Sequence, residues 1–319
     1  MLTDPFTLED IYAARETIKG VAFRTPIYSS SIFRRTGFPV YLKLECFQPT
    51  RSFKLRGATN KIKNCPSGKM IVTASSGNHG FAVSYVCMLL GRRATVCVPE
   101  TANPDKVRAI AECGAELVKV GRNYEDAYQQ ALRICQTNDG IMVHPYEDPL
   151  VMAGQGTVGL EIFEDRPDVN TVVVPIGGGG LICGTALAVK NLKKSVRVIG
   201  VQSENAPSMA EAFRHGAPIT TIPSATLADG MIVKCASEVT LMIVRQYVDE
   251  IVLVSDSDLE HALLGLLKED HILVEPSGAA SLAAILSGRL RKAQEETVAV
   301  VSGGNISIDY LSKLLGKSL

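Results

Sequence analysis

The sequence lacks net charge, since its 33 lysines and arginines are balanced by 33 aspartates and glutamates. A protein that attracts nucleic acid or an anionic membrane through its overall field carries a basic excess. The even balance therefore argues against both kinds of partner. With 319 residues, of which 46% are hydrophobic, the chain is long enough to form two domains with sizeable cores.

Paired cysteines are missing too. The chain has eight cysteines, but they are scattered and form neither a CxxC pair nor a metal-like cluster. In a chain of this size, such spacing favours reduced thiols in a cytosolic protein over a disulfide framework. The N-terminal segment 1–20 is acidic and amphipathic, whereas a signal peptide is basic and then apolar. We therefore expect a soluble, cytoplasmic protein.

No uninterrupted apolar run suits a membrane helix. An uncharged stretch, TVVVPIGGGGLICGTALAV at 171–189, has four consecutive glycines in its middle. These glycines disfavour a membrane helix and favour a strand, a loop and a helix in succession. A repeat of fixed period and a low-complexity segment are absent as well.

Short β-rich runs alternate with helical stretches through most of the chain. Apolar residues recur at helical spacing at 80–91, 104–114 and 124–136. Strands that are apolar throughout and joined by helices indicate buried parallel sheets. The predicted strands lie at 39–45, 69–75, 93–99, 115–121, 141–145, 171–176, 196–202, 250–255 and 297–304. Nine strands are many for one open sheet, so we predict an α/β protein with two open parallel-sheet domains.

The stretch TRSFKLRG at 50–57 places a lysine at the start of a predicted helix. Ser52 can cap this helix, and apolar residues follow at helical spacing. Lys54 then lies in the first turn, where the helix dipole disfavours a cation and lowers its pKa. Such a lysine suits a nucleophilic amine, as in a Schiff base. Taken alone, however, the stretch favours Lys54 and Arg56 as ordinary solvated charges.

Three further stretches follow predicted strands. SSGNHG at 75–80 has hydroxyls, an amide and backbone N–H groups that can bind a carboxylate, although an ordinary capped loop looks the same. The glycines at 177–180 let the backbone wrap a phosphate, while neither GxGxxG nor a GKS or GKT motif is present. Ser302, at a turn, can face a ring nitrogen. A reactive lysine, a phosphate cup and a ring-nitrogen partner together indicate pyridoxal phosphate chemistry.

Over nearly the whole chain, the sequence resembles fold-type II pyridoxal-phosphate enzymes of the threonine/serine dehydratase and serine racemase family. The motifs that carry the resemblance occur in the family's order and spacing: SFKLRGA, SSGNHG, HPYEDPLVMAGQGTVGLEI, VPIGGGGLICG, VIGVQSEN, TLADG, VEPSGAA and VSGGN. The resemblance implies a tryptophan-synthase-β-like fold. A large cofactor-binding domain would comprise residues 1–65 and 147–319, and a small mobile domain, 66–146, would close over the substrate.

The resemblance also implies roles for individual residues. Lys54 matches the Schiff-base lysine, which then removes the α-proton as general base, and Phe53 lies beside it near the ring. The other implied cofactor contacts are Asn78 at the 3-hydroxyl, Gly177, Gly178, Gly179 and Gly180 at the phosphate, Ser302 at the pyridine nitrogen, and Glu275 close by. The implied grip on the substrate carboxylate comes from Ser75, Ser76, Asn78 and His79.

The implied activity is that of an ammonia-lyase in amino-acid catabolism. It would convert a β-hydroxy amino acid, L-threonine or L-serine above all, into a 2-oxo acid and ammonia. With no regulatory domain expected after residue 319, the chain resembles the short catabolic type, a homodimer or homotetramer. Three alternatives stay open: a serine or aspartate racemase, a dehydratase of a larger or dicarboxylic β-hydroxy amino acid such as 3-hydroxyaspartate, and a ligand-binding relative without catalysis.

Three departures from the family pattern bear on these alternatives. Ser76 matches the second acid/base of the racemases, where many plain dehydratases have alanine. Gln202 and Ser208, with the Ala206 carbonyl, stand where the racemase branch holds a divalent cation with acidic side chains, so these residue types do not support a strong cation site. Arg51 stands where the family usually has glycine. Its guanidinium either points to solvent or receives a second substrate carboxylate.

Overall fold

The computed structural model describes residues 4–290 and 295–316. Parts of the predicted large domain, namely 1–3, 291–294 and 317–319, lie outside the described residues. The strands are β1 (Ile27–Ser29), β2 (Val40–Leu44), β3 (Ile71–Ala74), β4 (Ala94–Val98), β5 (Glu116–Lys119), β6 (Ile141–Met142), β7 (Thr171–Pro175), β8 (Arg197–Ser203), β9 (Glu250–Val254) and β10 (Thr297–Val301).

The helices alternate with these strands. They are α1 (Leu8–Ile18), α2 (Phe33–Thr36), α3 (Lys54–Lys63), α4 (Asn78–Leu89), α5 (Pro104–Glu112), α6 (Tyr124–Thr137), α7 (Pro149–Asp165), α8 (Gly180–Leu192), α9 (Ser208–His215), α10 (Glu238–Tyr247), α11 (Asp256–Glu269), α12 (Pro276–Leu286) and α13 (Ile308–Gly316). Two short 3-10 helices, η1 (Glu45–Phe47) and η2 (Asp229–Met231), complete the described elements.

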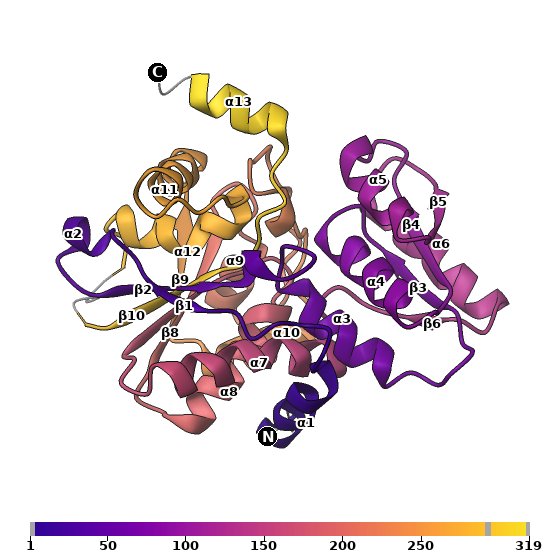
Figure 1. The fold of residues 1–319 in the computed structure, drawn as a ribbon, viewed down its shortest axis with the longest axis horizontal. Coiled ribbons are helices and arrows are strands. Elements are labelled where there is room, and N and C mark those ends of the chain that lie inside the picture. Colours follow the sequence, from indigo (N-terminus) through magenta and orange to yellow (C-terminus); the bar gives the residue numbers. More distant parts are fainter. Residues whose placement is uncertain (1–3, 291–294, 317–319) are drawn as a thin grey trace.

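The strands form two sheets, which confirms the predicted fold class. The large sheet has the order β1-β2-β10-β7-β8-β9, and the small sheet has the order β5-β4-β3-β6. All pairings are parallel except that of β1 with β2, which is antiparallel. Figure 1 shows the small sheet with α4, α5 and α6 on one side of the molecule and the large sheet on the other.

The nine predicted strands are all present, as β2 to β10, and the helices predicted at 80–91, 104–114 and 124–136 are α4, α5 and α6. Among the described strands, only β1 was not predicted. It has three residues at the edge of the large sheet, and its side chains are partly or fully exposed, so no apolar run marks it. Most of the predicted strands are shorter than expected; β6 and β10, for example, end early because the chain leaves the sheet after Met142 and after Val301.

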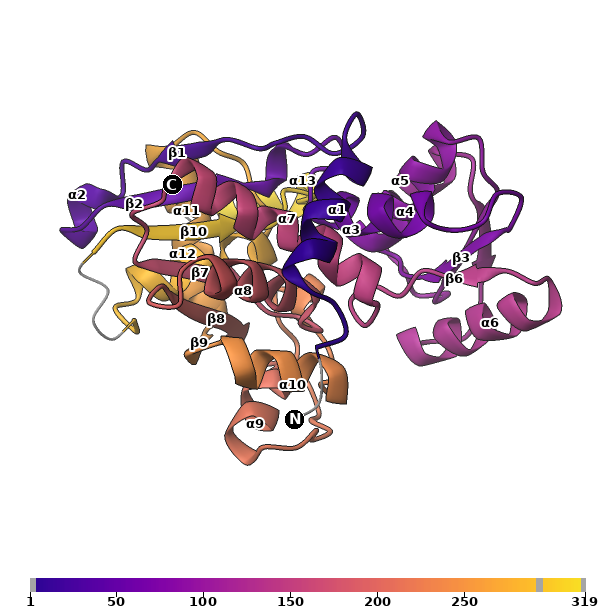
Figure 2. The ribbon, with the colours of Figure 1, turned by 90° about the horizontal axis from the view of Figure 1, so that it is seen from below.

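Helices cover both faces of the large sheet. Helices α1, α7 and α8 pack together on one face, as Figure 2 shows, and α11 and α12 pack on the other. The central strands β7 and β10 are buried along their whole length, as strands of a covered parallel sheet are. Among residues 4–290 and 295–316, no helix combines the length and the apolarity needed to cross a bilayer.

Helices α3 and α7 approach each other closely at two glycines. A Cβ on Gly154 of α7 would lie only 2.7 Å from the Cα of Gly57 in α3 and 2.8 Å from the Arg56 carbonyl oxygen. The backbones can meet because neither position has a side chain. Since α3 begins at Lys54, this contact fixes its first turn against the body of the large domain.

Candidate active site

The segment that contains the predicted lysine lies against the end of β10. Ser52 forms an antiparallel bridge with Gly303, and the Phe53 N–H donates to the carbonyl of Ser302 at 3.1 Å. The Glu275 N–H donates to the carbonyl of Gly303 at 3.2 Å. Three segments that are far apart in the sequence therefore meet at the carboxyl end of a parallel strand, where α/β folds bind their ligands.

Lys54 lies in the first turn of α3, as predicted. Its Nζ donates to the carbonyl of Pro145 at 2.7 Å and lies 5.1 Å from the centre of the Phe53 ring. Burial lowers the pKa of Lys54 to about 8, against a smaller opposing effect of the Glu275 carboxylate. The predicted direction is confirmed, with burial as the largest cause. Such a lysine is partly neutral near pH 7, as a nucleophile or general base requires.

Ser52 does not cap α3, which corrects the sequence prediction. The residue that precedes the helix is Phe53, whose backbone is already helical and whose side chain forms no cap. Within the described residues, the buried Oγ of Ser52 has no hydrogen-bond partner. The reason is the bridge to Gly303, which holds Ser52 in a strand-like pairing instead.

The four glycines form a turn between β7 and α8. Gly179 has a φ of +100°, which glycine adopts without strain, and α8 begins at Gly180. A Cβ on Gly178 would lie 2.3 Å from the Tyr146 ring, and one on Gly180 would lie 2.9 Å from the Tyr146 Cα. The turn thus brings backbone N–H groups without side chains of their own to a helix N-terminus, which suits a phosphate.

Asn78, the first residue of α4, is held by two other side chains. Its Nδ2 donates to Glu275 Oε1 at 2.7 Å, and its Oδ1 accepts from Asn305 Nδ2 at 2.7 Å. Asn305 also donates to the carbonyl of Thr50 at 3.0 Å. Burial raises the pKa of Glu275 to about 7. The amide of Asn78 is therefore fixed in orientation, beside a carboxyl group that is partly protonated near neutral pH.

The other predicted substrate residues lie at the start of the same helix. Ser75 and Ser76 are partly exposed, whereas His79 is buried. The His79 Nε2 lies 2.9 Å from the carbonyl of Val143, and its Nδ1 has no partner within the described residues. Burial, reinforced by the charge of Lys54, lowers the pKa of His79 to about 3. The ring is therefore neutral, and its Nε2–H donates to Val143.

Arg51 occupies a backbone position that favours glycine. Its φ is +56°, in the left-handed region, which costs a residue with a side chain about 1 kcal/mol. Two hydrogen bonds hold the turn: Arg51 N donates to the Gln48 carbonyl at 2.7 Å, and Gly304 N donates to the Arg51 carbonyl at 2.9 Å. The side chain is exposed and forms no ion pair with the described residues.

Comparison with known proteins supports this geometry. Residues 18–303 match the model of a family described as pyridoxal-phosphate dependent enzyme. The chain belongs to this family. It is 42% identical to the L-threonine ammonia-lyase of Thermotoga maritima, over 98% of this chain and 79% of the relative. It is 41% identical to the catabolic L-threonine dehydratase TdcB of Escherichia coli K12, over 98% and 97% of the two chains.

A solved structure extends the likeness to the whole fold. Maize serine racemase has a TM-score of 0.92 and 33% sequence identity with this chain, and the match covers 98% of both chains. The similarity confirms that the chain has the two-domain fold of pyridoxal-phosphate enzymes. It also shows that relatives named as lyases and relatives named as racemases share this fold.

The residues present fit pyridoxal phosphate, the cofactor of the family. The glycine turn ends at the N-terminus of α8, where backbone N–H groups suit a phosphate, and Tyr146 packs so closely that neither Gly178 nor Gly180 could carry a Cβ. The Lys54 amine is enclosed and partly neutral. Ser302 is only 5% exposed, and its Oγ lies 3.5 Å from the Ser277 carbonyl, a contact long enough to be exchanged for a better one.

Gln202, Ala206 and Ser208 lie at the turn from β8 to α9 but do not fit a divalent cation. Gln202 Oε1 accepts from the Ala210 N–H at 3.0 Å, so the amide presents its donor Nε2 on the other side. This Nε2 and the Ser208 Oγ are buried, and neither has a partner in the described part of the chain. Divalent cations of this kind need oxygen ligands. These side chains therefore do not offer the oxygen ligands that a divalent cation requires.

Pro145, Tyr146 and Asn305 belong to the site but were missed as site residues. All three stand within motifs that the sequence analysis quoted, HPYEDP and VSGGN. Their contacts with Lys54, the glycine turn and Asn78 span long sequence separations. A local pattern shows that such a segment is a loop, but it does not show which distant residue the loop will touch.

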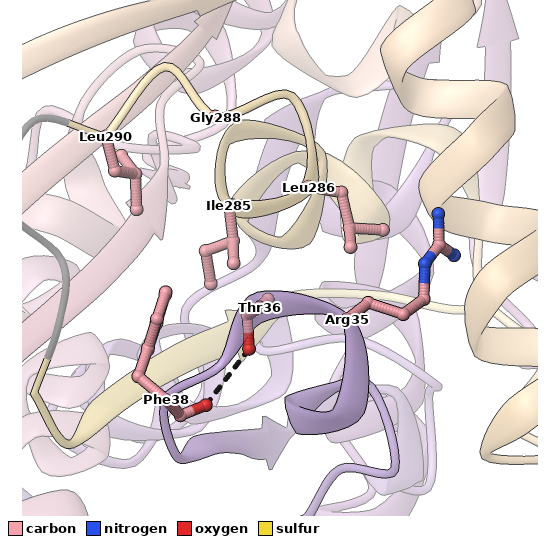
Figure 3. Close-up of a pocket in the computed structure, with 7 residues that line it drawn as sticks. All are labelled: Arg35, Thr36, Phe38, Ile285, Leu286, Gly288 and Leu290. Carbon is pink, nitrogen blue, oxygen red and sulfur yellow. Dashed lines mark hydrogen bonds between the residues drawn. The ribbon is translucent and has the colours of Figure 1, made fainter.

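A pocket of about 320 Å³ lies elsewhere, between α2 and α12. Figure 3 shows its lining residues, Arg35, Thr36, Phe38, Ile285, Leu286, Gly288 and Leu290. None of them is a residue of the site described above. The Arg35 guanidinium contacts α11 instead, at 3.1 Å from Glu269 Oε1 and 2.6 Å from His261 Nε2. The pocket is thus separate from the chemistry at Lys54.

Proposed function

We propose that this protein is an ammonia-lyase that converts L-threonine or L-serine into a 2-oxo acid and ammonia. The enclosed, partly neutral amine of Lys54 carries the proposal, because it lies where the glycine turn, Asn78 and the end of β10 meet. The names of relatives that are 41–42% identical support the substrate class. A ligand-binding protein without catalysis would have no need to keep a half-buried lysine with a lowered pKa.

The side chains of the site suggest how the reaction proceeds. Bound pyridoxal phosphate supplies an electron sink for the charge left at the α-carbon. Lys54 Nζ removes the α-proton, and Ser75, Ser76 and the N-terminus of α4 bind the substrate carboxylate. Glu275, with a pKa near 7, can donate a proton to the departing β-hydroxyl.

We also propose that residues 66–146 form a mobile small domain. The strands of the small sheet all lie within this range. Lys106 of α5 forms an ion pair with Asp229 of η2. This pair connects residues 66–146 with the remainder of the chain, which contains the large sheet. Such a pair can close the entrance over a bound substrate. Residues 1–65 and 147–319 would then form the large domain.

A cytoplasmic homodimer or homotetramer is the assembly that we propose. The eight cysteines are all free, which suits a reducing compartment. The resemblance to the short catabolic dehydratases supports the oligomer.

A product assay distinguishes lyase from racemase. Given L-serine or L-threonine, the protein is expected to form 2-oxo acid as the dominant product, because Lys54 and Glu275 supply a base and an acid for elimination. Coupled reduction of the 2-oxo acid and chiral chromatography of the amino acid measure the two products. Abundant D-amino acid that disappears in Ser76→Ala would show that racemisation dominates. Ser84→Ala, further along α4, is the matched control.

A dicarboxylic substrate is a second candidate, favoured by the strained backbone of Arg51. We expect Arg51→Gly to lower kcat/KM for 3-hydroxyaspartate about tenfold, because a bidentate partner of the second carboxylate is lost. For threonine, kcat/KM should stay within about twofold, while glycine relieves about 1 kcal/mol of strain. Parallel steady-state assays on both substrates test this. Equal changes for the two substrates would show that Arg51 only faces solvent.

A further inference from the structure

Four charged side chains form a buried cluster behind the first turn of α3. They are Lys43 of β2, Glu45 of η1, Arg56 of α3 and Glu161 of α7, hereafter the Arg56 cluster. Arg56, Lys43 and Glu45 have no exposed surface, and Glu161 is only 4% exposed. The cluster is charge-balanced, since it contains two cations and two carboxylates.

Arg56 is the centre of the cluster. Its guanidinium binds Glu45 through two hydrogen bonds, at 2.7 and 2.8 Å, and Glu161 through two more at the same distances. It also donates to Thr157 Oγ1 at 3.0 Å and to the Phe23 carbonyl at 3.2 Å. Both carboxylates are thus bound bidentately, in the fork geometry that arginine has and lysine lacks.

The cluster ties together segments that are distant in sequence. Lys43 Nζ donates to Glu161 Oε2 at 2.5 Å and to the Thr25 carbonyl at 2.6 Å. Thr25 Oγ1 donates to Glu45 Oε1 at 2.5 Å. The loop after α1, strand β2, helix η1 and helix α7 are therefore all connected to α3 through one guanidinium.

Such a cluster contributes orientation more than stability. Burial lowers the pKa of Lys43, and Glu161 offsets this only in part. For Glu45, burial is the largest single influence and opposes ionisation, but the charges of Arg56 and Lys43, together with the hydrogen bonds from Arg56 and Thr25, outweigh it and lower the pKa. Buried ion pairs lose much of their attraction to the cost of removing the ions from water, so apolar residues would often serve stability as well. Apolar residues, however, form no directional hydrogen bonds and so cannot fix the orientation of α3 in the way that Arg56 can.

The cluster lies on the opposite side of α3 from the site. Residues two positions apart on a helix point about 200° apart. Lys54 accordingly reaches the Pro145 carbonyl, while Arg56 reaches Glu45 and Glu161. Between them, Gly57 is pressed against α7, and its N–H donates to Gln155 Oε1 at 3.3 Å.

We propose that Arg56 is a positioning residue. It holds the first turn of α3 in the orientation that places Lys54 Nζ beside the cofactor and the substrate α-carbon. The cluster is neutral overall, so it acts through geometry. Burial and Glu275 are the influences that shift the pKa of Lys54. The kinetic part of the inference rests on the proposed function. Its structural part does not, because it concerns the backbone of α3 in the protein itself.

Arg56→Lys tests the proposal, because lysine keeps the positive charge but cannot bind two carboxylates bidentately as the guanidinium does. At a temperature well below unfolding, kcat of the holoenzyme should fall about 10- to 100-fold while KM stays within about threefold, as expected when a reacting group is misplaced. The pH profile should keep its shape. Hydrogen exchange should become about tenfold faster at the N–H groups of Phe53, Arg56 and Gly57 and stay unchanged in α12.

Two further variants complete the test. Arg166→Lys alters another paired arginine, which binds Glu296 outside the site, and should leave kcat and these exchange rates unchanged. If Arg56→Lys does not fold, Thr157→Val keeps all four charges, removes one partner of Arg56 and should lower kcat about threefold. Unchanged kcat in folded Arg56→Lys, or in its substitute Thr157→Val, overturns the proposal, as does exchange that rises equally everywhere. Wild-type protein without lyase activity would refute the proposed function alone, because the exchange measurement needs no turnover.

Discussion

Lys54→Met is expected to lower 2-oxo acid formation at least about a thousandfold, because the base at the α-carbon and the attachment point of the cofactor are lost together. The absorbance band of the bound cofactor near the border of visible and ultraviolet light should disappear. Steady-state assays and absorbance spectra of the purified protein measure both effects. A variant that keeps the band and the activity would refute every pyridoxal hypothesis for this chain. Lys63→Met, at the other end of α3, is the control.

The same variant should be more stable than the wild type when both lack the cofactor. The pKa of Lys54 is lowered from 10.5 to about 8, so the folded state resists protonation of this amine. The resulting destabilisation is fully present below pH 8 and vanishes as the pH rises to 10.5. Lys54→Met removes it, which should raise the free energy of unfolding by about 1 to 3 kcal/mol at pH 7. Denaturant titrations at several pH values measure the difference in the free energy of unfolding between the variant and the wild type. If this difference does not shrink above pH 8, the lowered pKa of Lys54 is not its cause.

The fold could be predicted largely from the sequence, because its strands are buried on both faces. Strands such as β7 and β10 are short, mostly apolar runs, and the segments between the strands have apolar residues at helical spacing. The edge strand β1 was not predicted, because its pairing with β2, and not its own composition, makes it a strand. The capping error at Ser52 has a similar cause. A serine before a helix is a good local cap, but a long-range bridge to Gly303 decides its conformation.

Some residues of the candidate site could likewise be predicted from the sequence, and others could not. Lys54 and the glycines at 177–180 could be singled out as candidates, since a lysine at a helix start and four glycines before a helix are visible in the sequence, although the lysine stretch alone favoured a solvated charge. The Pro145 carbonyl and the Arg56 cluster could not. A carbonyl is present at every residue, and the Arg56 cluster joins residues 43 to 161 only after α3 and α7 have packed. Side-chain charge on its own favoured a solvated surface for Arg56, which is instead completely buried.

Gly178→Ala should weaken the binding of pyridoxal phosphate about a hundredfold. The new methyl group would lie 2.3 Å from the ring of Tyr146, closer than two carbon atoms can approach. The ring packs edge-to-face on His144, in the segment that also accepts the Lys54 hydrogen bond, so its displacement would break that packing. The turn must therefore shift, and its N–H groups no longer converge on a phosphate. Titration of the cofactor-free protein, followed by absorbance, measures the dissociation constant.

A second substitution shows whether the clash with Tyr146 is the cause. In Gly178→Ala/Tyr146→Ala, the space vacated by the ring receives the methyl group, so the dissociation constant should recover at least about tenfold relative to Gly178→Ala. Gly316→Ala, in α13, where an added Cβ meets open space, should bind the cofactor as the wild type does. If the double variant binds no better than Gly178→Ala, the loss comes from the backbone of the turn itself. If Gly178→Ala binds normally, the glycine turn does not hold the phosphate, and the cup must be sought at another helix N-terminus.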